Sequence, residues 1–170
     1  MYEWHAVGGD RGRCGGKSCR KAPKKQRRYY SGKKKRHTQK AQVVVAHQTR
    51  EIICVAVGKG REHDFKLFKR SKLTIKEEIE CLADRGYQGL QKLHSNSQTP
   101  KKKPRRGELT KQEKRQNRIL ASRRLVGEHV LGKLKVFRIL SEKYRNRRKR
   151  FGLRLNLMAS LYNLDLKLPR

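Results

Sequence analysis

Two neighbouring runs of β-branched and small apolar residues dominate the first half of the chain. They cover residues 41–46 (AQVVVA) and 51–57 (EIICVAV), and the short polar segment 47–50 joins them. Short runs of this composition around a polar connection predict an antiparallel β-hairpin. Because both faces of the two strands are apolar, we expect their sheet to be covered on both sides.

Short elements and glycine turns follow the hairpin. Residues 62–70 place Phe65 and Phe68 three positions apart, which predicts one short helix with both rings on the same side. Residues 79–84 (IECLAD) predict a short buried strand, and it runs into the two-glycine turn 85–89 (RGYQG).

The second half predicts two further helices. After a polar loop over residues 95–107, Thr110 and Glu113 have the spacing of a capping box, so a long helix is expected to begin there. Residues 151–164 are apolar on nearly all sides, which predicts a buried final helix. One apolar stripe follows the long helix and should lie on the sheet: Ile119, Val126, Val130, Leu134 and Phe137.

The first 23 residues differ from the rest. They contain five of the glycines and the single Trp, and they show no apolar periodicity. We expect residues 1–23 to be unstructured and residues 24–170 to form the folded part. The abrupt change near Pro23 suggests a frame-shifted or mis-started segment joined to an intact remainder.

Charge narrows the choice of partner. The 170 residues include 47 Lys and Arg against 14 Asp and Glu, a net charge of +33, and only 34% are hydrophobic. One domain of this size would repel itself without a polyanion, so nucleic acid is the expected partner. No run approaches the roughly 20 apolar residues of a membrane span. The densest basic blocks are residues 24–28, 33–36, 101–106 and 145–150.

Two other motifs are weak candidates for chemistry. Residues 15–18 (GGKS) suggest a phosphate-binding loop, but Arg11 stands where that motif needs its first glycine. Zinc is disfavoured, because the first two cysteines are loosely spaced and the last two lie on predicted strands, where buried thiols are common. The four cysteines are Cys14, Cys19, Cys54 and Cys81.

Three acidic positions are candidates for chemistry, and each has a simpler explanation. Asp84 ends a strand, where it either holds a cation or caps its own turn. Glu128 lies opposite the apolar stripe, where it either faces a ligand or pairs with Arg124 one helical turn earlier. Asp64 begins the short helix, where an acidic side chain is favourable in any case.

Two segments, residues 82–89 (LADRGYQG) and residues 126–135 (VGEHVLGKLK), together resemble bacterial insertion-sequence transposases of the DDE superfamily. Glu128 of the second segment follows Asp84 of the first by 44 positions. The resemblance runs from about residue 24 to residue 166. Three further stretches fit the same family: residues 28–38 (RYYSGKKKRHT), 60–65 (GREHDF) and 137–148 (FRILSEKYRNRR).

The resemblance implies a ribonuclease H-like α/β fold, a mixed sheet with flanking helices. In that family three carboxylates bind two Mg²⁺ or Mn²⁺ ions that act on a phosphodiester. Carried over by position, Asp84 is the second metal-binding and catalytic carboxylate, and Glu128 is the third. The family's first Asp has no counterpart here, since Asp10 lies in glycine-rich sequence and is not assigned. We therefore expect the first central strand to be missing and the chain to be an inactive catalytic-domain fragment.

The resemblance further implies duplex DNA as partner, with transposon ends and target as substrates, a bacterial cytoplasmic, nucleoid-associated location, and compatibility with a homodimer. A non-catalytic basic nucleic-acid-binding protein is the alternative, and it shares the expected binding to DNA without sequence preference. The predicted DNA-binding residues are Lys33, Lys34, Lys35, Arg36, Lys101, Lys102, Lys103, Arg105, Arg106, Lys133 and Lys135.

Overall fold

The computed structural model of the chain has a mixed α/β fold. The residues it describes are 2–10, 29–31, 36–141 and 150–169, with backbone alone for 2–10, 31 and 36–37. The elements are β1 (Tyr2–Asp10), β2 (Tyr30–Ser31), β3 (Arg36–Ala46), β4 (Ile52–Lys59), α2 (Asp64–Ser71), β5 (Cys81–Ala83), the 3₁₀ helices η1 (Arg85–Tyr87) and η2 (Leu90–Lys92), β6 (Ser97–Gln98), α3 (Lys111–Leu134), α4 (Arg138–Ser141) and α5 (Phe151–Lys167).

The predicted hairpin is confirmed and lies within a mixed sheet. β3 pairs antiparallel with β4, placing Val43 opposite Val55. On its other side β3 pairs antiparallel with β1, and β1 continues the sheet through parallel β5 and β6. The strand before Asp84 therefore belongs to the same sheet as the hairpin, as predicted.

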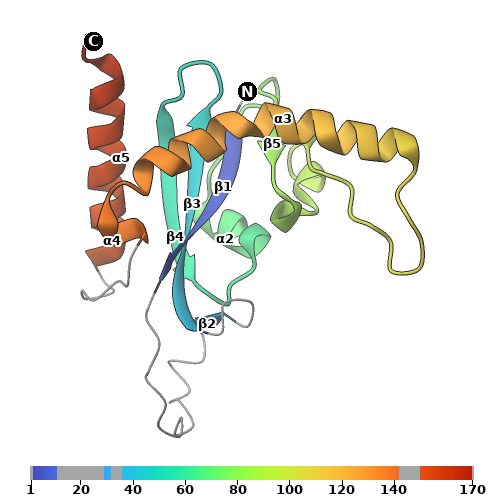
Figure 1. The fold of residues 1–170 in the computed structure, drawn as a ribbon, viewed down its shortest axis with the longest axis horizontal. Helices are drawn as coiled ribbons and strands as arrows, with labels where there is room; N and C mark the ends of the chain where they lie inside the picture. Colours follow the sequence, from blue (N-terminus) through green and yellow to red (C-terminus); the bar gives the residue numbers. More distant parts are fainter. Residues whose placement is uncertain (1, 11–28, 32–35, 142–149, 170) are drawn as a thin grey trace, which may run out of the picture.

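The prediction that the N-terminal segment is unstructured is wrong for residues 2–10, which form β1 between β3 and β5 (Figure 1). We had expected the first central strand of the sheet to be missing, and β1 occupies a central position. Apolar and polar residues alternate over Tyr2, Glu3, Trp4, His5 and Ala6, a period typical of a strand. The glycines that follow obscured this signal.

Both faces of the sheet are covered, as the apolar hairpin predicts. Val43 and Val45 of β3 point into a core shared with α3 and α5. Val44, between them, points into a second core with Phe68 of α2 and Tyr87 of η1. Because successive side chains of a strand point to opposite faces, β3 contributes to a core on each side of the sheet.

Helix α5 is buried on one face only, which corrects the expectation of a helix buried all round. Phe151 and Leu155 are 1% and 0% exposed, whereas Leu153 and Leu157 are 71% and 60% exposed. The helix packs against β4 at the margin of the sheet (Figure 1), and none of the elements that the structure describes covers its outer side. Asn163 fixes it there, because its amide bonds both the backbone N–H and the C=O of Ile52 at 2.8 Å.

Helix α3 begins with the predicted capping box. Thr110 Oγ1 accepts from the Glu113 amide, and the Glu113 carboxylate accepts from the Thr110 amide. Only its C-terminal third packs on the sheet, where Val130 and Leu134 are buried. Ile119 is 53% exposed, so the stripe extends less far than predicted, and Phe137 lies beyond the helix end.

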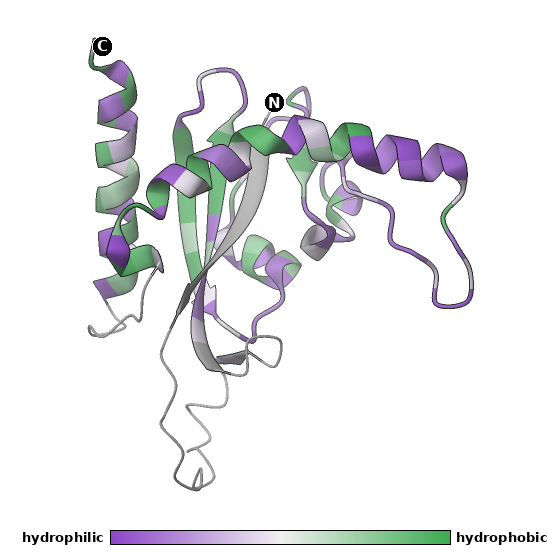
Figure 2. Cartoon of the chain, in the orientation of Figure 1, coloured by the Kyte–Doolittle hydropathy of each residue, from purple (hydrophilic) through white to green (hydrophobic). Residues whose placement is uncertain are grey.

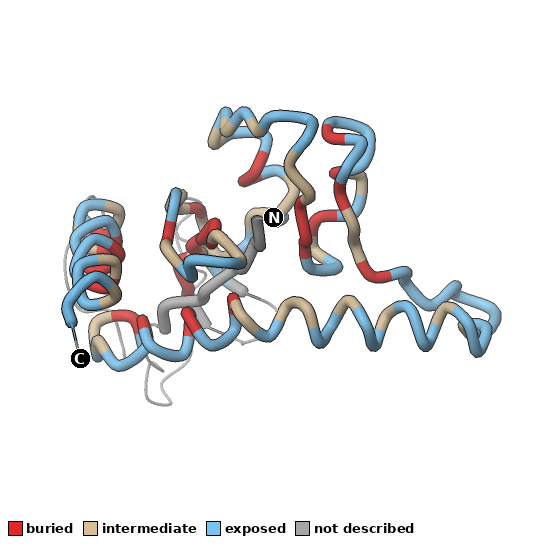
Figure 3. The backbone as a smooth tube through the Cα atoms, turned by 90° about the horizontal axis from the view of Figure 1, so that it is seen from above, coloured by how far each residue is buried: buried red, intermediate tan, exposed pale blue. Residues whose placement is uncertain are grey.

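The remainder of α3 projects past the sheet, as Figure 3 shows from above. Figure 2 shows this projecting half as mainly hydrophilic. In the described part of the chain, no helix combines the length and hydropathy needed to cross a bilayer.

Candidate carboxylate site and nucleic-acid interface

Asp84 lies where β5 ends and η1 begins. Its Oδ1 accepts a hydrogen bond from the Arg85 amide at 2.6 Å and lies 3.4 Å from Nη1 of Arg124. The side chain is 54% exposed, so solvent still reaches the carboxylate. Asp84 therefore caps its turn, as the simpler explanation expects, and is also accessible to a ligand.

Arg124, which lies beside Asp84, is one helical turn before Glu128 on α3. Arg124 and Glu128 occupy positions i and i+4 of α3. Their Cβ atoms are therefore neighbours on one helix face, about 5–6 Å apart. Glu128 is exposed. The fold therefore brings the two predicted site carboxylates to the same side of the domain, with the Arg124 guanidinium beside Asp84.

A contact between α3 and the strand region fixes this arrangement. Arg123 Nη2 lies 2.6 Å from Oε2 of Glu80, which precedes β5. Because Arg123 and Arg124 are adjacent, this ion pair holds the helix against the same strand whose end carries Asp84. No sequence pattern predicts this pairing, since Glu80 and Arg123 are 43 positions apart.

Asp64 packs against η1, the 3₁₀ turn that follows Asp84. Its carboxylate forms an ion pair with Lys40 of β3 at 2.8 Å. The same carboxylate lies against Gly86, so that a Cβ at position 86 would overlap it. Burial raises the pKa of the Tyr87 phenol, and Asp64 and Asp84 raise it further. The sequence predicts Asp64 only as an acidic residue at a helix terminus, and its contact with Gly86 could not be predicted from it.

Replacing Gly86 by Ala is expected to destabilise the fold by about 1–3 kcal/mol, because Asp64 must move away from Lys40 to admit the methyl group. Urea unfolding measures the change. Gly132→Ala is the matched control, since a Cβ there meets nothing within 4 Å. Gly132 lies inside a helix, so replacing it by Ala should instead raise the free energy of unfolding by about 0.5–1 kcal/mol. Equal effects at the two positions would contradict the packing of Asp64 on Gly86.

In the register of the sheet, the acidic residue of β1 nearest to Asp84 is Glu3, which lies opposite Leu82. β1 places Trp4 beside Ala83, the residue immediately before Asp84. The next residue of β1 is His5, and Asp10 is five positions further along the strand, which at about 3.3 Å per residue is roughly 17 Å away. Asp10 therefore does not supply a carboxylate beside Asp84.

The carboxylates whose side chains the structure describes do not complete the two-metal site that the resemblance implies. Among the residues that the structure describes, no three His, Cys, Asp or Glu side chains group so as to hold a metal ion. Asp84 and Glu128 are only two carboxylates, and Asp84 already faces the Arg124 cation. Mg²⁺ needs near-octahedral oxygen ligation, so two carboxylates leave it dependent on water and phosphate oxygens.

The predicted DNA-binding residues fall into three groups. Lys33, Lys34 and Lys35 lie outside the described residues, and only the backbone of Arg36 is described. Lys101 pairs its ammonium with Glu113 at 3.2 Å and is 60% exposed. The remaining residues are all exposed, in the loop before α3 or at its C-terminal end: Lys102, Lys103, Arg105, Arg106, Lys133 and Lys135.

Comparison with known proteins places the chain in a family. The model of a family described as DDE superfamily endonuclease matches residues 17–163. A protein of Microchaete diplosiphon described as "Probable transposase for insertion sequence element IS702" is 51% identical over 147 residues, 86% of this chain and 53% of that protein. No solved structure matches.

The chain belongs to the DDE superfamily endonuclease family, as the family match covers most of its length. Within it, the chain is similar to the IS702-type insertion-sequence transposase. This confirms the family predicted from the Asp84 turn and the Glu128 helix. The chain spans about half the length of the curated relative it matches.

Proposed function

We propose that the chain is a DNA-binding part of a DDE transposase catalytic domain with a ribonuclease H-like sheet. The single observation that carries this is the convergence of Asp84, at the end of β5, and the Arg124–Glu128 turn of α3, in a chain that matches the family. The mixed sheet, with helices on both faces, supports the same fold.

The basic surface would bind duplex DNA through its phosphates. Exposed lysines and arginines lie in the loop before α3 and at the end of that helix. Phosphate contacts position a protein without reading base sequence. The expected substrates of the whole transposase are transposon ends and target DNA, and this chain would contribute affinity for the duplex.

Asp84 and Glu128 are proposed as the second and third carboxylates of the family's metal site. In the complete site, carboxylates would hold two divalent ions, which would supply Lewis-acid stabilisation of the oxygens at a phosphodiester. In this chain the residue beside Ala83 on β1 is Trp4 and Asp10 is distant, so we derive no reaction step through the metals. The chain alone is expected to bind one divalent ion weakly and to be inactive.

Mn²⁺ binding and cleavage of supercoiled DNA test this proposal together. Wild type is expected to bind Mn²⁺ weakly, detected by electron paramagnetic resonance, and to leave the plasmid intact. Asp84→Ala and Glu128→Ala should each abolish the bound-ion signal. Glu77→Ala, which removes an exposed carboxylate outside the site, should leave the signal unchanged.

Two outcomes would contradict the proposal in different ways. Mn²⁺ binding that survives both Asp84→Ala and Glu128→Ala would refute the site. Plasmid cleavage by wild type that both variants abolish would support the site and refute the expected inactivity.

A non-catalytic basic nucleic-acid-binding protein is the second candidate. One observation favours it: Asp84 already has a structural task, since it caps η1 and faces Arg124. The same variants separate the two functions. If Asp84→Ala lowers stability and leaves metal binding unaffected, the structural role alone accounts for Asp84.

A further inference from the structure

The loop before α3 and the first half of that helix form a basic arm, residues 99–122. No residue from 101 to 126 is buried, and the arm extends beyond the sheet (Figures 1 and 3). Residues 101–118 include nine lysines and arginines and two glutamates. Each glutamate is paired with a lysine of the arm, Glu108 with Lys114 and Glu113 with Lys101.

The helical part of the arm has two opposite faces. Glu113 and Asn117, one turn apart, are half-buried and face the loop. The opposite face carries basic residues at positions i, i+3, i+4 and i+7, the spacing of one continuous helix face. These exposed residues are Lys111, Lys114, Arg115 and Arg118.

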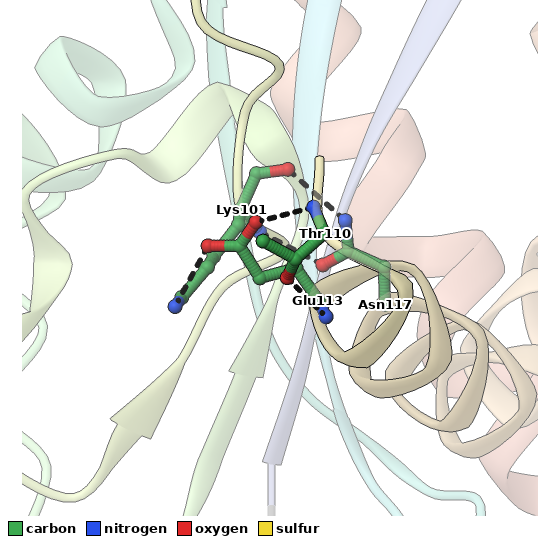
Figure 4. A network of polar contacts seen from close by, with 4 residues as sticks. All are labelled: Lys101, Thr110, Glu113 and Asn117. Carbon is green, nitrogen blue, oxygen red and sulfur yellow. Dashed lines mark hydrogen bonds and ion pairs between the residues drawn. The ribbon is translucent and has the colours of Figure 1, made fainter. Parts of the chain in front are cut away.

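Hydrogen bonds hold the loop on the inner face of the helix, as Figure 4 shows. Asn117 accepts from the Lys101 amide at 2.9 Å and donates to the Lys101 carbonyl at 3.1 Å. The Thr110 backbone lowers the pKa of Glu113, and the Lys101 side chain lowers it further. The loop and the helix therefore form one preorganised unit at neutral pH.

We propose that the helical part of this arm lies in the major groove of duplex DNA with its outer face toward the DNA, and that Lys111, Arg115 and Arg118 contact phosphates along the groove. The proposal rests on the proposed DNA-binding function and assigns it to a particular element. At 1.5 Å per residue, the twelve helical residues of the arm extend about 18 Å. The major groove of B-form DNA is about 12 Å wide and admits one helix. Lys114 is left out because it is paired with Glu108.

A matched pair of triple variants tests the arm. The arm variant is Lys111→Gln with Arg115→Gln and Arg118→Gln. The control variant carries the same loss of charge at exposed lysines outside the arm: Lys66→Gln, Lys76→Gln and Lys92→Gln. All six side chains are exposed, so both proteins should keep the wild-type circular dichroism spectrum and melting temperature. Fluorescence anisotropy with a labelled 20-base-pair duplex measures affinity across a salt series.

The arm variant should lose more than about tenfold in affinity at moderate salt. Its salt slope should become shallower by about 0.9 for each lost phosphate contact, and thus by about three in total. The control variant should change the slope by less than about one. Equal losses in the two variants would overturn the proposal, because affinity would then follow net charge alone. If wild type showed no salt-dependent binding, the proposed DNA-binding function itself would fail.

Two further measurements separate groove insertion from simple attraction. Asn117→Ala keeps every charge but frees the loop from the helix, so affinity should fall severalfold with the salt slope unchanged. Unaltered affinity would refute the preorganised arm. An RNA duplex of the same length has a deep, narrow major groove that a helix cannot enter. Binding to RNA as tight as to DNA would refute insertion into the groove.

Discussion

Raising the NaCl concentration from about 50 to 200 mM is expected to weaken binding to duplex DNA by about a thousandfold to a hundred-thousandfold, the range for six to ten phosphate contacts. The net charge of +33 and the exposed basic residues around α3 make that number of contacts available. Each neutralised phosphate releases counterions, and added salt opposes their release. Anisotropy titrations at five salt concentrations would measure the slope.

Two duplexes of unrelated sequence provide the control for this prediction. Because phosphate contacts carry no sequence information, both should give the same slope and similar affinity. Affinity that is indifferent to salt would contradict a phosphate-based interface. A strong preference for one duplex would show that this chain reads bases.

Replacing Phe151 by Ala is expected to lower the free energy of unfolding by about 3–5 kcal/mol. Phe151 is 1% exposed and joins α5 to the core shared by β3 and α3. The substitution removes buried apolar surface and leaves a cavity that the sheet cannot close. Urea denaturation of wild type and variant gives the difference directly.

Leu153→Ala is the control for that prediction. Leu153 is in the same helix, two positions further on, but it is 71% exposed. A surface substitution of this kind should change stability by about 0.5 kcal/mol or less. A loss at Leu153 as large as that at Phe151 would mean that another element or another chain covers the outer face of α5.

Sequence patterns predicted the elements that depend only on residues close together in the chain. The β-branched runs around residues 47–50 gave the hairpin, and Thr110 with Glu113 gave the start of α3, because a cap depends only on residues three apart. β1 was missed because its glycines masked five alternating residues. The outer face of α5 was assigned wrongly, because periodicity cannot tell a helix at the margin of a sheet from one inside the core.

The candidate site was predictable residue by residue, but its contacts were not. Asp84 and Glu128 could be singled out from motifs, whereas Arg124 beside Asp84 depends on how α3 crosses the sheet. The same holds for Asp64 beneath Gly86, since α2 and η1 meet only in the folded chain. Long-range pairings of this kind leave no periodic signal in one sequence.

Helix α3 connects the two proposed functions. Its exposed N-terminal half carries the basic arm, and its packed C-terminal third carries Glu128 and meets the sheet near Asp84. Arg115 and Glu128 are thirteen positions apart on this one helix, about 20 Å along its axis. DNA held by the arm would therefore lie within the span of a few base pairs from the carboxylates.

The most direct test of the carboxylate site is anomalous diffraction at the manganese edge from crystals of the DNA-bound chain soaked in MnCl₂. We predict one Mn²⁺ peak that contacts carboxylate oxygens of both Asp84 and Glu128, with the Arg124 guanidinium displaced from Asp84. A peak elsewhere, or Asp84 and Glu128 on opposite sides of the domain, would contradict the site.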